Sequence, residues 1–234
     1  MSTGFPGFPS EAITFLRGVA RNNNREWFLP RKPLFEEKLK RPMFELVEAV
    51  NTAMKGFAPE YVTDPAKAIS RFYRDTRFSK DKSPYKDHMA AGFSRRGLAC
   101  GGAGYYCAVS LKGVGIGGGV YMALPPTLLA IRNHIAEHHQ EFRRIAEARA
   151  VRGLFGELKG EQLSRVPKGF AKDHPAEDLL RFKQFLLYVD LPIEVATGPE
   201  LYVEIRKHFR AMVPFLEFLN SPLVNSQNKA NDRV

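Results

Sequence analysis

The sequence predicts an α+β fold, with N-terminal helices and later long helices packed on a central, mainly antiparallel sheet. Apolar residues recur with helical spacing in the first quarter of the chain and again after residue 125. Between these regions, apolar and polar residues tend to alternate, as they do in half-buried strands. Helices that precede and follow a cluster of strands, instead of alternating with them, favour α+β over a βαβ arrangement.

The first helix is expected to begin near Ser10, a residue type that caps helix N-termini, with its apolar residues on one face. Asparagines at positions 22–24 interrupt the pattern, because asparagine both ends helices and caps the next one. Helical spacing resumes over residues 34–50, where Pro42 is expected to separate two helices. We interpret the break as a helix cap followed by a buried Trp27, and not as a binding site.

Strands are predicted for residues 68–78, 89–93, 105–111 and 114–122, separated by glycine-rich or charged turns. A helix is expected over residues 125–148, since proline fits the first turn of a helix. Residues 179–189 are expected to form a helix and then a strand, and residues 199–219 a final helix kinked at Pro214. Residues 1–224 are predicted to form one domain, and the polar residues 225–234 a disordered tail.

Composition limits the class of protein. The chain has 234 residues, of which 44% are hydrophobic and 26% charged, as in ordinary globular proteins. No run approaches the roughly 18 apolar residues that a membrane span needs, and the N-terminus lacks the pattern of a secretory signal. Cys100 and Cys107 are too few to cross-link a chain of this size. We therefore expect free thiols, a reducing cytoplasmic location and no membrane partner.

The excess of positive charge lies in the middle of the chain. The formal net charge is +10, from 35 Lys and Arg against 25 Asp and Glu. Nine basic and three acidic side chains give residues 70–120 a charge of +6, and nine and five give residues 121–172 a charge of +4. This distribution points to an anionic partner, and the alternative is a general contribution to solubility.

The charged segment, residues 70–86, holds the candidate site. Six basic side chains, two acids and four aromatic rings lie in its seventeen positions. If its first half forms a strand, Phe72 and Phe78 face the core and Arg74 lies partly desolvated between them. A desolvated guanidinium needs a carboxylate, a phosphate or carbonyl partners. The opposite face carries Asp75 between two arginines, so at least one guanidinium is expected to be free for a ligand.

We predict that the charged segment binds an anionic ligand, such as the phosphate of a nucleotide or of nucleic acid. Arg and Lys side chains together with Tyr hydroxyls hold phosphate or carboxylate without a metal. Tyr73 and Tyr85 are expected to stack on the ligand or hydrogen-bond to it. The alternative is an ion-pair network in which Asp75 and Asp81 neutralise the cations. The predicted ligand-binding side chains are Arg71, Arg74, Arg77, Lys80, Lys82, Tyr85 and Lys86.

A second hypothesis is an enzyme, a hydrolase or transferase, that acts on a small anionic substrate at the same site. Arg74 and Arg77 would then clamp the substrate. Asp75, Asp81 or His174 would move a proton, and histidine is included because it titrates near neutral pH. Both hypotheses place an anion beside the same arginines.

The charged segment also carries a resemblance to a known family. Residues 74–86 read RDTRFSKDKSPYK and resemble the signature of domain-of-unknown-function family 2461, found in bacteria and some fungi. The resemblance covers about residues 8–220. It implies a single-domain, cytoplasmic protein of unknown activity and supplies no catalytic residues. Its other landmarks are NNNREWF at 22–28, GGG at 117–119, IR at 131–132, PKGF at 167–170 and DHP at 173–175.

Two further motifs match known patterns only formally. Residues 134–138 match the H-x-x-E-H pattern of zinc hydrolases, but His138 falls within the apolar stripe of its predicted helix, and no third protein ligand is found. Residues 113–118 match G-x-G-x-x-G, but a dinucleotide loop opens a helix and this one continues as a strand. We expect no metal and no cofactor, and attribute the glycines to close approach of another segment, such as the charged one.

Overall fold

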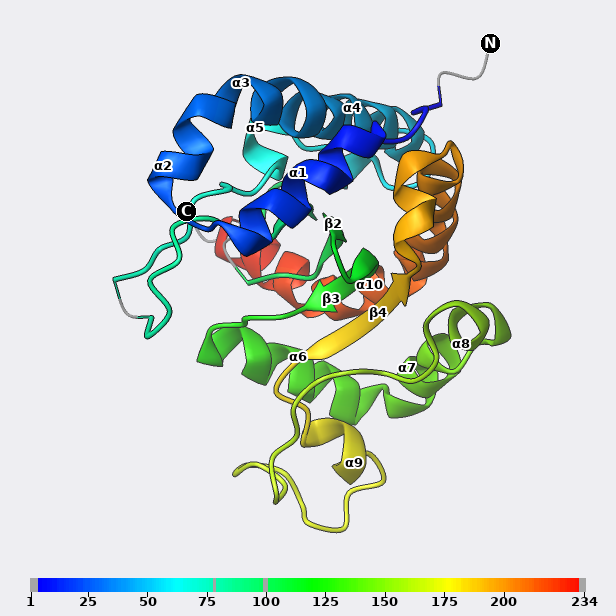
Figure 1. Ribbon diagram of the computed structural model, residues 1–234. Helices are drawn as coiled ribbons and strands as arrows, with labels where there is room; N and C mark the ends of the chain where they lie inside the picture. The colour runs from blue at the N-terminus through cyan, green and yellow to red at the C-terminus, as the bar shows by residue number, and fades with distance from the viewer. Residues whose placement is uncertain (1–3, 78, 99–100, 232–234) are drawn as a thin grey trace. The chain divides into compact units, whose positions relative to one another are not determined.

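The computed structural model describes residues 4–77, 79–98 and 101–231, which form two compact units (Figure 1). Unit 1 consists of Met1–Phe93, Tyr106–Ile116 and Asp190–Lys207. Unit 2 consists of Ser94–Tyr105, Gly117–Val189 and His208–Val234. The chain passes between the units several times, and the single domain expected for residues 1–224 stays a prediction.

The α+β class is confirmed. Four strands form one antiparallel sheet in the order β1-β2-β3-β4. The strands predicted from residues 89, 105 and 114 onward correspond to β1, β2 and β3, and the predicted helix-then-strand over residues 179–189 corresponds to α9 and β4. The strands are β1 (His88–Ser94), β2 (Gly104–Ser110), β3 (Gly113–Val120) and β4 (Phe185–Leu191).

The glycines of β3 allow β4 to approach closely. In unit 2, a Cβ added at Gly119 would lie 2.0 Å from the carbonyl oxygen of Phe185, and one at Gly117 would lie 2.7 Å from that of Leu187. The expectation of a close neighbour is therefore correct, but that neighbour is β4 and not the charged segment. Because a hydrogen-bonded strand runs directly beside these glycines, they serve backbone packing.

The prediction of a strand over residues 68–78 is wrong. The described residues of this stretch, 68–77, make two isolated antiparallel bridges, Ile69 with Ala91 and Tyr73 with Tyr85, and no strand. Of the described residues between Tyr73 and Tyr85, six are charged and none is buried, so they cover neither face of a strand, and Pro84 has no N–H to give a ladder. Phe78, expected to face the core, lies outside the described residues.

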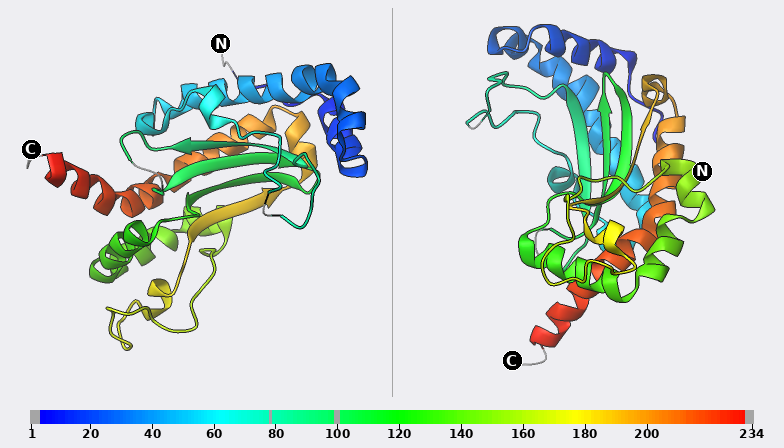
Figure 2. Two further views of the ribbon diagram at one scale, coloured as in Figure 1. Left: turned by 90° about the vertical axis from the view of Figure 1, so that its left-hand side faces the viewer. Right: turned by 90° about the horizontal axis from the view of Figure 1, so that it is seen from below.

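The N-terminal helices lie over the strands of unit 1 (Figure 2). Asn24 caps α2 as expected, because its Oδ1 accepts a hydrogen bond of 2.9 Å from Trp27 N–H. Trp27 itself is only half-buried, whereas Phe28 is fully buried, so the prediction of a buried Trp27 is wrong. Pro42 stands in the first turn of α4. The helices of unit 1 are α1 (Ser10–Arg21), α2 (Arg25–Phe28), η1 (Leu29–Arg31), α3 (Lys32–Phe35), the π-helix η2 (Glu36–Lys40), α4 (Arg41–Met54), η3 (Pro59–Tyr61), α5 (Pro65–Ala68) and η4 (Ile193–Thr197).

The later helices differ from expectation in two respects. The helix predicted over residues 125–148 is interrupted at His138, whose φ of −122° and ψ of 31° are not helical. The last helix, α10, contains Pro214 and its backbone continues over residues 225–231, within the segment predicted as a tail; residues 232–234 lie outside the described residues. These helices are α6 (Pro125–Glu137), α7 (His139–Ala146), α8 (Arg149–Phe155), α9 (Glu177–Leu180) and α10 (Glu200–Asn231).

An aromatic cluster in the core of unit 1 anchors the charged segment at both ends. Phe72 and Tyr85 are both buried, and Tyr85 stacks on Phe28 with ring centroids 4.1 Å apart. Phe72 contacts Phe35 at 4.7 Å. Buried aromatic rings contribute strongly to core stability, so these contacts fix the two points where the charged segment leaves the core.

Candidate functional site

The side chain of Asn23 pairs with the backbone of Tyr85 at the base of the charged segment. Its Nδ2 donates to Tyr85 O at 3.0 Å, and its Oδ1 accepts from Tyr85 N–H at 3.0 Å. The segment also closes on itself, because Arg74 N–H donates to Pro84 O and Lys86 N–H to Phe72 O. Sequence reasoning treated the asparagine run only as a helix cap and missed this contact, since the two residues are 62 positions apart.

Two of the predicted arginines are paired within the charged segment. Arg74, whose side chain is 29% exposed, forms an ion pair with Asp81. Arg77 is 77% exposed and contacts both oxygens of Asp75, with Nη2 2.7 Å from Oδ2. The hydrogen bond from Arg77 holds the pKa of Asp75 below its ordinary value, and Asp75 raises the pKa of Arg77. The ion-pair alternative therefore describes these two arginines.

Asp81 is fixed by more than one donor. Its Oδ1 accepts from Ser83 N–H at 2.9 Å, as in an Asx turn. Hydrogen bonds from Ser83 and then from Arg74 hold the pKa of Asp81 well below its ordinary value. This carboxylate is therefore ionised and already bonded to Ser83 and Arg74, so its low pKa and its contacts do not suit a general base.

Four cations of the charged segment form no ion pair within the described chain: Arg71, Lys80, Lys82 and Lys86. The first three are exposed, and the charge of Arg71 acts on Asp75, whose pKa it lowers. Lys86 is half-buried, and burial followed by the charge of Arg71 lowers its pKa. Two like charges thus lie close enough to oppose each other, and the less exposed one has no internal anion.

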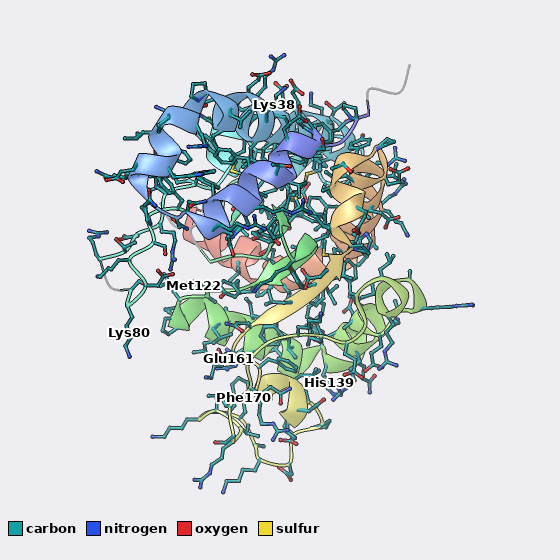
Figure 3. The ribbon with its side chains drawn as sticks, in the orientation of Figure 1. Lys38, Lys80, Met122, His139, Glu161 and Phe170 are labelled. Carbon is teal, nitrogen blue, oxygen red and sulfur yellow. The ribbon has the colours of Figure 1, made fainter. Side chains whose placement is uncertain are left out.

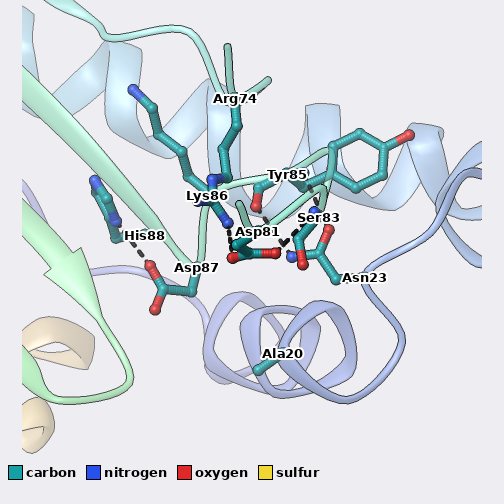
Figure 4. A pocket seen from close by; sticks show the side chains of 9 residues that line it. All are labelled: Ala20, Asn23, Arg74, Asp81, Ser83, Tyr85, Lys86, Asp87 and His88. Carbon is teal, nitrogen blue, oxygen red and sulfur yellow. Dashed lines mark hydrogen bonds and ion pairs between the residues drawn. The ribbon is translucent and has the colours of Figure 1, made fainter. Parts of the chain in front are cut away.

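A hollow of about 470 Å³ opens beside Lys86 (Figure 4). It brings together the predicted residues Arg74, Tyr85 and Lys86, and Asp81 with them. This volume is within the usual range for sites that bind small molecules. The hollow is lined by Ala20, Asn23, Arg74, Asp81, Ser83, Tyr85, Lys86, Asp87 and His88.

The other predicted residues lie outside the lining of this hollow. Lys82 Nζ donates to the carbonyl oxygen of Thr76 at 2.9 Å, a local contact. Lys80 extends from the tip of the segment (Figure 3). His174 belongs to unit 2, where its Nδ1 accepts a hydrogen bond of 3.0 Å from Ala176 N–H, so it caps its own turn.

Sequence reasoning also missed a carboxylate–imidazole pair in the hollow. Asp87 Oδ1 lies 2.9 Å from His88 Nδ1, and this contact is the main reason why the pKa of Asp87 is lowered. Both residues follow the charged segment directly in the sequence. Extending the search for titratable groups by two positions beyond Lys86 would have found them.

The remaining candidates for chemistry occupy structural positions. His134 contacts the ring of Phe218 at 4.5 Å and that of His138 at 4.6 Å, and its pKa is lowered first by burial. No group of three or more metal-ligating side chains occurs in the part of the chain that the structure describes. Cys107 is buried, which raises its thiol pKa to about 12, and Cys100 lies outside the described residues. Of the described helices, none has both the length and the hydropathy needed to cross a membrane.

Comparison with known proteins identifies a family that covers most of the chain. A family model for a conserved hypothetical protein, DUF2461, matches residues 11–218, which include the charged segment and every residue lining the hollow. No curated protein matches the chain, and no solved structure matches it.

Proposed function

The chain belongs to the DUF2461 family of conserved hypothetical proteins, and from this premise we propose that it binds a phosphate-bearing or other anionic ligand in the hollow beside Arg74 and Lys86. The observation that carries the proposal is the position of Lys86. A half-buried ammonium beside Arg71, with no internal carboxylate among the described residues, is unfavourable in the unliganded protein. An anion in the hollow would relieve that cost.

Arg74 supports the same proposal. A guanidinium has five N–H donors, and its ion pair with Asp81 is made through Nη1 alone. The Asp81 carboxylate marks a position where an anionic oxygen contacts Arg74 at the edge of the hollow. A phosphate has several acceptor oxygens and can therefore contact Arg74 and Lys86 together, as Arg and Lys do in other phosphate sites.

The experiment is a thermal-unfolding titration with inorganic phosphate, pyrophosphate and AMP. At a ligand concentration of about 100 times Kd, mass action stabilises the protein by about 2.7 kcal/mol. For a domain of this size, that corresponds to an increase in Tm of roughly 5–11 °C. The Lys86→Met variant should lose this increase while having a higher Tm than the wild type without ligand, because it removes a disfavoured cation.

Lys55→Met is the matched control, because it removes the same charge from an exposed position just beyond the end of α4. It should retain the full increase in Tm. If the Lys55 and Lys86 variants show equal changes in Tm with the anions, the anions act on the general surface charge, and the hollow is rejected as the binding site. The absence of any increase with all three anions would reject the proposal altogether.

The Asp87–His88 pair favours a second candidate function, an enzyme that acts on a small anionic substrate in the same hollow. A carboxylate bound to Nδ1 orients an imidazole and fixes its tautomer, which leaves Nε2 to transfer a proton. Incubation with a panel of phosphate monoesters, followed by assay of released phosphate, tests this candidate. If this candidate function is correct, His88→Gln abolishes the release of phosphate but keeps the increase in Tm on anion binding. If the wild type releases no phosphate, this candidate function is rejected.

A further inference from the structure

A second cavity, of about 540 Å³, lies elsewhere in unit 1 and shares no lining residue with the hollow. Its walls come from α2 to α4, from the stretch between α5 and Tyr73, and from β1. We refer to it as the aromatic groove, because five of its lining residues are Phe or Tyr. It is lined by Phe28, Lys32, Phe35, Glu36, Lys40, Phe44, Ala66, Ile69, Ser70, Arg71, Phe72, Tyr73 and Met89.

Three of the five rings form a packed floor. Phe28, Phe35 and Phe72 are buried, and their centroids lie between 4.7 and 5.9 Å apart. The other two rings are open to solvent, with Phe44 39% and Tyr73 51% exposed. Exposed ring faces beside a buried aromatic floor favour a flat aromatic occupant, because aromatic rings gain from offset or edge-to-face contact beyond the burial of area.

The charge at the groove is positive. Lys32 and Arg71 are exposed, and neither forms an ion pair within the described ranges. Glu36 does not offset them, because its carboxylate is 2.7 Å from Lys40 Nζ. An occupant that carries an anionic group would therefore be complementary to Lys32 and Arg71.

The backbone is also unusual at this place. Glu36 and Lys40 are the first and last residues of the π-helix η2, and both line the groove. π-Helical turns are rare and occur frequently at functional sites, where the wider turn changes the direction of side chains. This observation is independent of the charges and rings, and it marks the same groove.

We propose that the aromatic groove is a second binding site, for a small molecule that joins a flat aromatic ring to an anionic group, such as an aryl phosphate or an aryl carboxylate. The ring lies against Tyr73 and Phe44, above the buried floor. The anionic group contacts Lys32 and Arg71. The groove and the hollow at Lys86 have no lining residue in common, although the charges of Arg71 and Lys86 oppose each other.

The test measures the affinity of 1-naphthyl phosphate by isothermal titration calorimetry on the full chain. The wild type should bind it at least tenfold more tightly than 1-naphthol, which has no charge, and than decyl phosphate, which has no ring. Tyr73→Ala should weaken binding about tenfold, in the range of single aromatic stacking contacts. Phe44→Ala, which removes the other exposed ring, should act in the same direction. Lys32→Gln should weaken binding about threefold, as expected for an exposed charge.

Three matched variants make the result specific. Tyr121→Ala removes an exposed ring and Lys55→Gln an exposed charge, both outside the groove, and neither should change Kd. Lys86→Gln removes a charge that acts on Arg71 but no lining residue of the groove, so it should change the affinity for 1-naphthyl phosphate less than Tyr73→Ala does. If Lys86→Gln weakens binding and the groove variants do not, the probe occupies the hollow, which overturns this inference while supporting the proposed function.

Other outcomes overturn the inference directly. If decyl phosphate binds as tightly as 1-naphthyl phosphate, the groove accepts alkyl chains and does not select an aromatic ring. If 1-naphthol binds as tightly as 1-naphthyl phosphate, Lys32 and Arg71 have no role in binding. The absence of binding to the wild type would exclude the site. Tyr73→Ala should keep the circular dichroism spectrum and the cooperative thermal unfolding of the wild type, which verifies that this variant is folded.

Discussion

Replacing Asn23 by alanine is expected to destabilise the protein and to detach the base of the charged segment. In the wild type, the Asn23 side chain satisfies both backbone polar groups of Tyr85, a residue that is 2% exposed. Alanine leaves the Tyr85 N–H and C=O without these partners. Because Lys86 follows Tyr85 directly, the same change also displaces one wall of the hollow.

The magnitude follows from the two bonds. Each intramolecular hydrogen bond contributes about 1 kcal/mol net, so their loss costs about 2 kcal/mol in the free energy of unfolding. A chain of this size changes its Tm by about 2–4 °C per kcal/mol, which gives a decrease of about 4–8 °C. The stacking of Tyr85 on Phe28 remains, so the variant should still fold.

The assay is urea unfolding followed by circular dichroism, with Asn22→Ala as the control. Asn22 is exposed, and its side chain donates only to the nearby carbonyl of Gly18. Its replacement should change stability by less than about 0.5 kcal/mol. If Asn23→Ala is no more destabilising than Asn22→Ala, the aromatic contacts alone place Tyr85, and the argument from its backbone bonds is refuted.

Three further changes test other parts of the structure. Ser83 and Arg74 lower the pKa of Asp81 from its ordinary value of 3.8, so the stability that Asp81 contributes is present above that pH and is lost as the pH falls through the lower folded-state pKa. Asp81→Asn should therefore flatten the decrease in Tm below about pH 4. An unchanged decrease in this variant would contradict the role of Asp81. Gly119→Ala should cost about 3 kcal/mol or more, because φ is +128° and the new Cβ would meet Phe185 O. The control is Gly153→Ala in α8, where an added Cβ meets nothing within 4 Å, and it should stabilise the protein by up to about 1 kcal/mol. If urea unfolding shows equal effects for Gly119→Ala and Gly153→Ala, the packing argument for β3 is refuted.

Local sequence patterns predicted much of the fold. The strands β1, β2 and β3 and the helix-to-strand change before β4 followed from periodicity and from turn residues. The cap of α2 by Asn24 followed from the residue type. In each case the physical cause acts within a few residues, through alternation, helical spacing or a side chain that bonds a backbone group close in sequence.

The prediction of a strand over residues 68–78 is wrong because the alternation of apolar and polar residues does not show whether other elements cover the two faces of the strand. Among the described residues of the charged segment, Phe72 and Tyr85 are buried in the aromatic core, and the described residues between them form a solvated turn with ion pairs of its own. Trp27 and Phe28 show the same difficulty, since both are aromatic and only the packing of α1 to α3 decides which one is buried.

The sequence by itself determined the composition of the candidate site: a concentration of positive charge and aromatic rings in one short segment, inside a recognisable family signature. Tertiary structure alone decided which cations have an internal anion, which backbone groups pair with a distant asparagine, and which cation lines an open hollow. The physical reason is one of range. Charge and periodicity are properties of neighbouring residues, whereas the partner of Tyr85 is 62 positions away, and the isolation of Lys86 depends on every segment that folds around it.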